Sequence, residues 1–339
     1  MAALFGHMDY WNVSGDILAK EIKNGMREEP VGQAAFFSIC YFLLSVPTVL
    51  GNALVIAAVW KDPLKTLRSS PTNFILLSLA IADLLAGVVF GPGAALFYLR
   101  LALKAYPWTP LMTVLVFNHY FLLVSVFHVL ILTIDRYFAL AKPLKYRAVV
   151  TKGRVRIASS SIWVSCFGVA VLSSIVQRNF FVLWFVYFLI IWIASESFSC
   201  LYLLILKKLY RHHHTRIMQE NSQSNLVLLC QREKKVSMLI LSVVLVFYLC
   251  CLPWQINQVL LFFCRVCHEH YRAWMVFYHV ATLLLFLNSA LNPLLYSWRF
   301  SKFRATFRYF LTKVCSQRRH RQRRTICITE ERRSYDTKL

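Results

Sequence analysis

Acidic and basic side chains inside apolar segments are the residues of this chain best suited to chemistry. Asp135 and Arg136 are adjacent near the end of an apolar run that begins near Trp108. An ionised side chain at the centre of a bilayer costs roughly 2.5–3.5 kcal/mol on insertion scales. We therefore expect this pair at a membrane boundary, either as charges that anchor a helix end or as a pair that can exchange partners.

A second group of polar residues points to cation binding. Asp83 and Glu196 are the other acids of the apolar segments, Ser125 lies about three helical turns before the acid–base pair, and Asn288 and Asn292 are an i, i+4 pair on one helix face. Their oxygens could surround a small hard cation with Asp83 as the charged ligand, since such ions prefer oxygen. A hydrogen-bonded polar network that stiffens the protein is the alternative.

Seven apolar segments must position these groups, and each is long enough to cross about 30 Å of hydrocarbon. We expect them at about 35–60, 72–98, 108–140, 157–176, 180–206, 236–263 and 273–298. The sequence therefore predicts an all-α membrane protein with a seven-transmembrane helix bundle over residues 35–298. The expected flanking parts are an extracellular N-terminus (1–34), an amphipathic helix (299–314) and a basic cytoplasmic tail (315–339).

Composition and charge agree with a membrane protein. The chain is 58% hydrophobic, whereas soluble domains are usually about 45–50% apolar. Its net charge of +23 does not indicate nucleic-acid binding, because the basic residues cluster in short links between apolar runs. With the N-terminus outside, most of the 38 Lys and Arg residues fall on the inner side, as the positive-inside rule requires.

The segment after the last apolar run has the pattern of a helix that lies on a membrane surface. Phe303, Phe307 and Phe310 recur at helical spacing, with Arg304 and Arg308 on the opposite face. Such an amphipathic helix is expected to lie on the inner leaflet.

Two motifs carry a resemblance to a known family. The third segment ends in Asp135-Arg136-Tyr137, and the seventh contains Asn292-Pro293-Leu294-Leu295-Tyr296. Over nearly its whole length the chain resembles a rhodopsin-like (class A) G-protein-coupled receptor, closest to the melanocortin, adenosine and cannabinoid group. The resemblance implies a plasma-membrane receptor, not an enzyme, that transmits binding of a small molecule, lipid or short peptide to a heterotrimeric G protein.

The resemblance also implies the moving parts and partners. Arg136 can pair with Asp135 or with Glu233, and an Arg136–Glu233 pair at rest would tie two helix ends that separate when the sixth helix moves outward. Tyr202 and Tyr296 are the tyrosines expected to swing in. The resemblance implies a sodium ion, but no other cofactor or metal, at Asp83, Ser125, Asn288 and Asn292. Arrestin, receptor kinases and membrane lipids are further expected partners, and nucleic acid is not.

The sequence departs from the family in its sixth and fifth segments. Pro253 kinks the sixth segment, but Cys251 stands where the family has a toggling tryptophan, and Ala194 replaces the usual proline of the fifth segment. Activation by the usual aromatic rearrangement is therefore in question.

Covalent modifications are predicted at four residues. The family's disulfide cannot form, because its position in the third segment is Leu111. A local bridge between Cys264 and Cys267 is the expected substitute on the oxidising side, and a zinc site with two nearby histidines is the alternative. Asn12 begins a glycosylation sequon, and Cys315 is a candidate for palmitoylation.

Two substitutions restrict the ligand. Asn118 stands where amine receptors have an aspartate, so a simple cationic amine loses its anchor, and Phe286 replaces the lysine that binds retinal. The expected pocket comprises Asn118, His119, Phe121, Trp254, Gln255, Gln258 and His279. Its histidines could make the response pH-sensitive, although hydrogen-bonded histidines of the bundle are the favoured reading.

An alternative function is an ion or solute transporter in which Asp83 and Glu196 relay ions. A transporter of this kind should show an internal repeat or paired broken helices, and neither is visible in the sequence. A membrane enzyme would need a metal or nucleophile constellation, which the few membrane acids do not supply.

Overall fold

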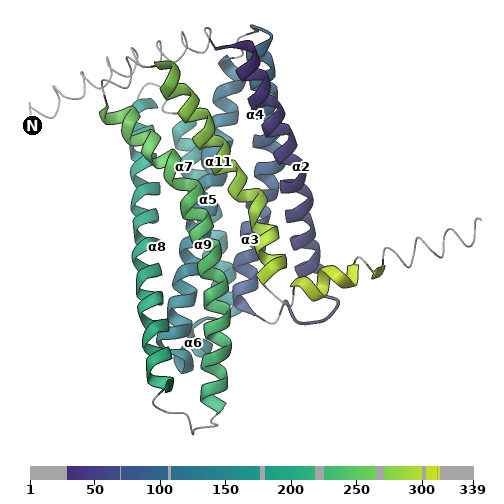
Figure 1. Ribbon diagram of the computed structural model, residues 1–339, viewed down its shortest axis with the longest axis vertical. Helices are drawn as coiled ribbons and strands as arrows, with labels where there is room; N and C mark the ends of the chain where they lie inside the picture. Colours follow the sequence, from purple (N-terminus) through teal and green to yellow (C-terminus); the bar gives the residue numbers. More distant parts are fainter. Residues whose placement is uncertain are drawn as a thin grey trace, which may run out of the picture.

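The structure is a computed structural model that describes residues 29–68, 70–105, 108–175, 180–217, 225–264, 271–299, 303–310 and 312–313. These residues form long helices that run side by side (Figure 1). In chain order the helices are α2 (Val31–Lys61), α3 (Pro71–Leu85), the π-helical turn η1 (Ala86–Phe90), α4 (Gly91–Ala102), α5 (Trp108–Ala141), α6 (Pro143–Val149), α7 (Lys152–Ile175), α8 (Phe180–Ile217), α9 (Asn225–Phe263) and α11 (Tyr271–Arg299).

Seven stretches of these helices are long and apolar enough to cross a membrane. They are Val31–Lys61, Pro71–Ala102, Val116–Ala141, Lys152–Leu172, Trp184–Lys208, Leu241–Leu261 and Arg272–Ser297. The predicted all-α, seven-helix fold is confirmed. Helices α8 and α9 extend beyond the expected fifth and sixth membrane segments, since α8 continues to Ile217 and α9 begins at Asn225.

The two ends of the bundle are called here the Glu29 end and the Arg136 end. Glu29 precedes α2, and Arg136 lies in the last turns of α5. A large apolar cluster joins α3, α5, α8, α9 and α11. A second, mainly aromatic cluster fills the Glu29 end between α2, α4 and α11. The core thus consists of a large cluster that runs along most of the bundle and a smaller aromatic one at the Glu29 end.

Close packing of α2 on α11 fixes the position of the NPxxY motif. A Cβ added to Gly51 would lie 2.9 Å from Cγ of Pro293, closer than real Cβ contacts. Asn52, the next residue, donates from Nδ2 to the backbone oxygen of Ser289 at 3.0 Å. Glycine at position 51 therefore allows the two helices to meet next to Asp83 and its partners.

The amphipathic helix lies at residues 303–310, across the end of the bundle (Figure 1). Phe303 is buried, and its ring centroid is 6.0 Å from that of Tyr296. Arg304 and Arg308 are exposed. The predicted two-faced pattern is confirmed for these residues, and its contact with a membrane surface stays a prediction.

Asp62 holds the turn that follows α2. Its carboxylate accepts hydrogen bonds from the backbone N–H groups of Thr66, Leu67 and Arg68 at 2.9, 3.0 and 2.9 Å. Burial raises the pKa of this carboxyl, but these three bonds and the Arg68 charge outweigh burial, so its pKa lies below the usual value. The ionised form is therefore the one that stabilises the turn.

Replacing Asp62 with asparagine is expected to lower stability by about 1–2 kcal/mol at pH 7, because charge-assisted bonds are lost. A carboxyl whose pKa is depressed by folding contributes above its unfolded pKa, and the contribution disappears as pH falls through the folded pKa. Unfolding of the protein in nanodiscs at pH 7.0 and pH 3.0 measures this. The difference between variant and wild type should shrink at pH 3.0, and an equal difference at both pH values would contradict the assignment.

Candidate functional site

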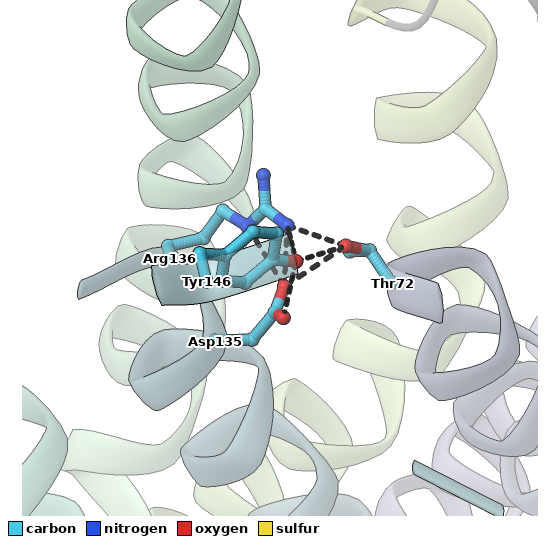
Figure 2. Close-up of polar contacts among 4 residues, drawn as sticks. All are labelled: Thr72, Asp135, Arg136 and Tyr146. Atoms are coloured by element: carbon cyan, nitrogen blue, oxygen red, sulfur yellow. Dashed lines mark hydrogen bonds and ion pairs between the residues drawn. The ribbon is translucent and has the colours of Figure 1, made fainter. Parts of the chain in front are cut away.

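A buried polar cluster surrounds Arg136 at the end of α5 (Figure 2). The Nε and Nη2 atoms of Arg136 donate to Oδ2 of Asp135 at 2.9 and 2.5 Å. The two side chains are each 3% exposed. Because a buried charge is costly without a partner, Asp135 and Arg136 stabilise each other, and the predicted Asp135 pairing is present.

Two residues from other helices complete this cluster. Thr72, in the first turn of α3, accepts from Nη2 of Arg136 and donates to Oδ2 of Asp135 at 2.9 Å. Tyr146, on α6, donates its hydroxyl to Oδ1 of Asp135 at 2.7 Å and accepts from Nη2 of Arg136 at 3.1 Å. Figure 2 shows all four side chains converging from the three helices.

Tyr146 remains a hydrogen-bond donor in this cluster. Burial raises the pKa of its phenol, and this outweighs the opposing effect of the Arg136 charge. Sequence reasoning missed both Thr72 and Tyr146. The sequence feature that could have drawn attention to Tyr146 is its position between Lys145 and Arg147, in the link that follows the third segment.

The other predicted switch residues lie on neighbouring helices. Glu233 belongs to α9, but its side chain lies outside the described part of the structure, so the Arg136–Glu233 pair stays a prediction. Tyr137 and Tyr202 pack against one apolar cluster formed by α5, α8 and α9. Tyr296 is fully buried, and Pro253 lies inside α9.

Asp83 lies at the centre of a second polar site and is fully buried. Its Oδ1 accepts from Oγ of Ser289, and its Oδ2 accepts from Nδ2 of Asn292, each at 2.7 Å. The Ser125 hydroxyl is also a hydrogen-bond partner of Asp83. The structure therefore brings Asp83, Ser125 and Asn292 together and adds Ser289, which sequence reasoning missed although it follows Asn288 directly.

The residues around Asp83 fit a small hard cation. Oδ1 of Asn288 is buried and has no hydrogen-bond partner among the described residues. One carboxylate, serine hydroxyls and an amide oxygen are ligands that a hard cation prefers. Asn292 directs its Nδ2 toward Asp83 and so orients the carboxylate; its predicted role as a sodium ligand stays a prediction.

A polar contact between α8 and α9 lies where the family has its aromatic toggle. Nε2 of Gln255 donates to Oγ of Ser195 at 2.5 Å and contacts Sγ of Cys251 at 3.6 Å. All three side chains are buried. Two bulkier side chains, Phe198 and Phe247, pack edge to face with ring centroids 5.7 Å apart. Helices α8 and α9 are thus held together here by a hydrogen bond as well as by aromatic packing.

Two predicted pocket residues share an aromatic neighbour. The ring centroid of Tyr187, on α8, is 4.5 Å from that of His119 and 6.4 Å from that of Trp254. The Tyr187 hydroxyl donates to the backbone oxygen of His119 at 3.0 Å. This stack joins α5, α8 and α9, and Trp254 is followed directly by Gln255.

The remaining predicted pocket residues do not form one group. Asn118 is half-buried. Gln258 is fully buried, and neither atom of its amide has a partner among the described residues. Phe121 packs in the same aromatic cluster as Phe286, and His279 borders that cluster through Tyr98 and also contacts Glu29.

Comparison with known proteins decides the family. A family profile described as "7 transmembrane receptor (rhodopsin family)" matches residues 51–296. The chain belongs to the rhodopsin family of seven-transmembrane receptors. The predicted resemblance is thereby confirmed, and the chain is a multi-pass membrane protein.

Several named receptors are similar to this one. The guinea pig (Cavia porcellus) adenosine receptor A2a is 27% identical over 82% of this chain and 73% of its own length. Neuromedin-U receptor 1 of Mus musculus is 27% identical over 91% and 84%. Somatostatin receptor type 3 of Rattus norvegicus is 29% identical over 81% and 68%. This range of names assigns the family without selecting a ligand.

The structure argues against the transporter alternative for this receptor. Asp83 is fully buried, whereas Glu196 lies on the exposed face of α8. A relay needs both acids in one interior path, so the predicted role of Glu196 in such a relay is wrong. Sequence periodicity alone had left the facing direction of Glu196 open.

The predicted modification sites of the receptor are described only in part. Cys264 is disulfide-bonded. Cys267 lies outside the described residues, as do Asn12 and Cys315. The Cys264–Cys267 pairing, the glycan and the palmitoyl group stay predictions.

Proposed function

We propose that the receptor transmits binding of an extracellular ligand to a heterotrimeric G protein through outward movement of α9. The main support for this proposal is the Arg136 cluster, in which the guanidinium forms hydrogen bonds with Asp135, Thr72 and Tyr146 at the same time. The Glu29 end faces outward and the Arg136 end faces the cytoplasm of the plasma membrane. Release of Arg136 then frees a cation for the G protein in the opened cleft.

The path from ligand to cleft runs along α9. A ligand that displaces Trp254 or His119 moves the part of α9 that carries Gln255. The hydrogen bond from Gln255 to Ser195 connects α9 to α8. Breaking that bond costs about 0.5–1.5 kcal/mol, which ligand contacts can supply. Pro253 lacks an N–H group and lets α9 bend there.

The ligand is a small molecule, lipid or short peptide with neutral hydrogen-bonding groups. Gln258 supports this chemistry, because its buried amide has both a donor and an acceptor without a partner among the described residues, and an unsatisfied buried group costs about 1–3 kcal/mol. The printed names of the relatives refer to adenosine, neuromedin U and somatostatin, so they are compatible with more than one chemical class. Arrestin, receptor kinases and anionic lipids are further partners of the proposed cycle.

Cyclic-AMP and calcium signalling in cells that express the full chain tests this proposal. Cells are challenged with small-molecule, lipid and peptide libraries, and surface expression is measured in parallel. At least one ligand class should change a G-protein-dependent signal. A well-expressed chain that never couples to any G protein, while solute flux depends on Asp83, contradicts the proposal.

The Asp83 site is proposed to bind sodium. Asp83, Ser125, Ser289 and the unpartnered oxygen of Asn288 would hold the ion, and Asn292 would orient the carboxylate. A bound cation neutralises a buried carboxylate. It links α3, α5 and α11 and so stabilises the resting bundle.

Sodium is expected to stabilise the wild-type receptor by about 1.4 kcal/mol at ten times its Kd, and Asp83→Asn is expected to abolish this gain. Thermal unfolding in nanodiscs with NaCl, against KCl at equal ionic strength, measures the effect. Ser289→Ala should weaken it. If Asp83→Asn keeps the full sodium response, the ion binds elsewhere.

A further inference from the structure

A third buried ionisable cluster lies at the Glu29 end, apart from the Arg136 cluster and the Asp83 site. Nδ1 of His279, on α11, is 2.5 Å from the hydroxyl of Tyr98 on α4. Nε2 of the same ring is 3.3 Å from Oε1 of Glu29, the residue that precedes Pro30 and α2. His279 is 1% exposed and Glu29 is 4% exposed. One imidazole therefore bridges three separate parts of the chain.

The surroundings of His279 are nearly all aromatic. Its ring centroid lies 5.1 Å from those of Phe37 and Tyr98 and 5.5 Å from that of Tyr278. Tyr41 stacks on Tyr98 with ring planes 9° apart. Water is thus excluded from most of the ring, which strengthens the electrostatic contacts that it makes.

The titratable and charged groups around His279 come from each packed element. They are Glu29 before α2, Tyr41 on α2, Tyr98 on α4, Lys104 after α4 and Tyr278 on α11. Lys104 is exposed and donates from Nζ to the backbone oxygen of Glu29 at 2.8 Å. The aliphatic side chains of α9 that pack on this part of α11, Leu260 and Leu261, carry no charge.

Protonation changes what this cluster can do. Nε2 of His279 and Oε1 of Glu29 are 3.3 Å apart but make no hydrogen bond, so a neutral imidazole leaves both atoms unpartnered among the described residues. A protonated imidazole carries a positive charge that the Glu29 carboxylate balances as an ion pair. A balanced pair is much less costly to bury than a single charge. A proton on His279 therefore strengthens the tie between α11 and the segment that leads into α2.

We propose that His279, Glu29 and Tyr98 form an extracellular proton-binding site that holds the receptor in its resting arrangement. The structure contains this tie together with the Arg136–Asp135 pair. The helix that carries His279, α11, also carries Asn292, the partner of Asp83, and Tyr296. A ligand shifts a conformational equilibrium toward the state that it binds better, and here the ligand is the proton. The effect on signalling rests on the proposed function, whereas proton binding itself does not.

The first test observes the ring directly. The full chain is labelled at histidine ring nitrogens and placed in nanodiscs, and the His279 signal is assigned by its loss in His279→Gln. At the same pH the ring should carry more charge in wild type than in Glu29→Gln, because the carboxylate 3.3 Å away balances the imidazolium. A ring that stays neutral in wild type from pH 5 to 8, or whose charge does not depend on Glu29, overturns the proposal.

The second test measures basal signalling at external pH 6.0 and 8.0 with internal pH clamped. Wild type should signal about fivefold less at pH 6.0, the lower range of allosteric coupling. His279→Gln should remove the difference, and Tyr98→Phe should reduce it. Tyr278→Phe is the matched control: it removes a hydroxyl one residue away and should keep the difference.

The two tests separate the two proposals. Retention of the pH difference in His279→Gln, or its equal loss in Tyr278→Phe, overturns the role of this cluster in signalling. If no variant signals at either pH, the proposed function fails, and the ring measurement still decides whether His279 binds the proton.

Discussion

Arg136→Ala is expected to reduce G-protein signalling by at least about 30-fold, since loss of one charged contact at a desolvated interface costs 2 kcal/mol or more. In the resting bundle the guanidinium is held by Asp135, Thr72 and Tyr146. After release it is the cation that the proposed cleft offers to the G protein. Ligand-stimulated cyclic-AMP or calcium signals, normalised to surface expression, measure the change.

Arg136→Lys is the matched variant for this prediction. Lysine keeps the charge but lacks the planar fork that lets Nε and Nη2 contact Asp135 together. Its signal should lie between those of wild type and Arg136→Ala. A normally expressed Arg136→Ala receptor with full signalling would remove Arg136 from the coupling mechanism.

Asp135→Asn is expected to raise basal signalling about tenfold, because replacing charge-assisted bonds to Arg136 with neutral ones costs about 1.4 kcal/mol. Asparagine has nearly the same shape as aspartate, so the cluster can still form, but its hydrogen bonds to Arg136 become weaker. Thr72→Val, which removes one hydroxyl from the same cluster, should produce a smaller rise. Ligand-free signalling at matched expression measures both.

The double variant Asp135→Asn, Arg136→Ala distinguishes release of Arg136 from a general loosening of the bundle. Removing the cation should cancel the raised basal signal, because the two residues act through one contact. A double variant that keeps the high basal signal contradicts the release mechanism. Glu233→Ala, tested beside it, should also raise basal signalling if Glu233 is the second predicted partner of Arg136.

The predicted pocket illustrates how far periodicity reaches. Placing His119, Trp254 and Gln255 toward the interior agrees with the structure, because apolar and polar faces alternate along each helix. Phe121 and His279 were assigned to the same pocket, yet they border the aromatic cluster between α2, α4 and α11. Periodicity predicts which face of a helix points inward, but it does not predict which neighbouring helix that face contacts.

The sequence by itself determined the seven spans, the amphipathic helix and the family motifs around Arg136 and Pro293. Each is a local property: a run of apolar residues must be long enough to cross hydrocarbon, and a backbone in lipid must satisfy its own hydrogen bonds as a helix. These properties can be read from one segment of the sequence, without knowing which helices pack against it.

Only the tertiary structure decided the partners of the buried polar groups. Ser289 reaches Asp83 across 206 positions and Tyr98 reaches His279 across 181, while Tyr146 closes the Arg136 cluster from the short α6. These contacts depend on the rotation and axial position of each helix, which are set by packing such as that of Gly51 on Pro293. Rotation about a helix axis changes a side chain's partner without changing the hydrophobic pattern of the sequence, so these contacts come from the assembled bundle.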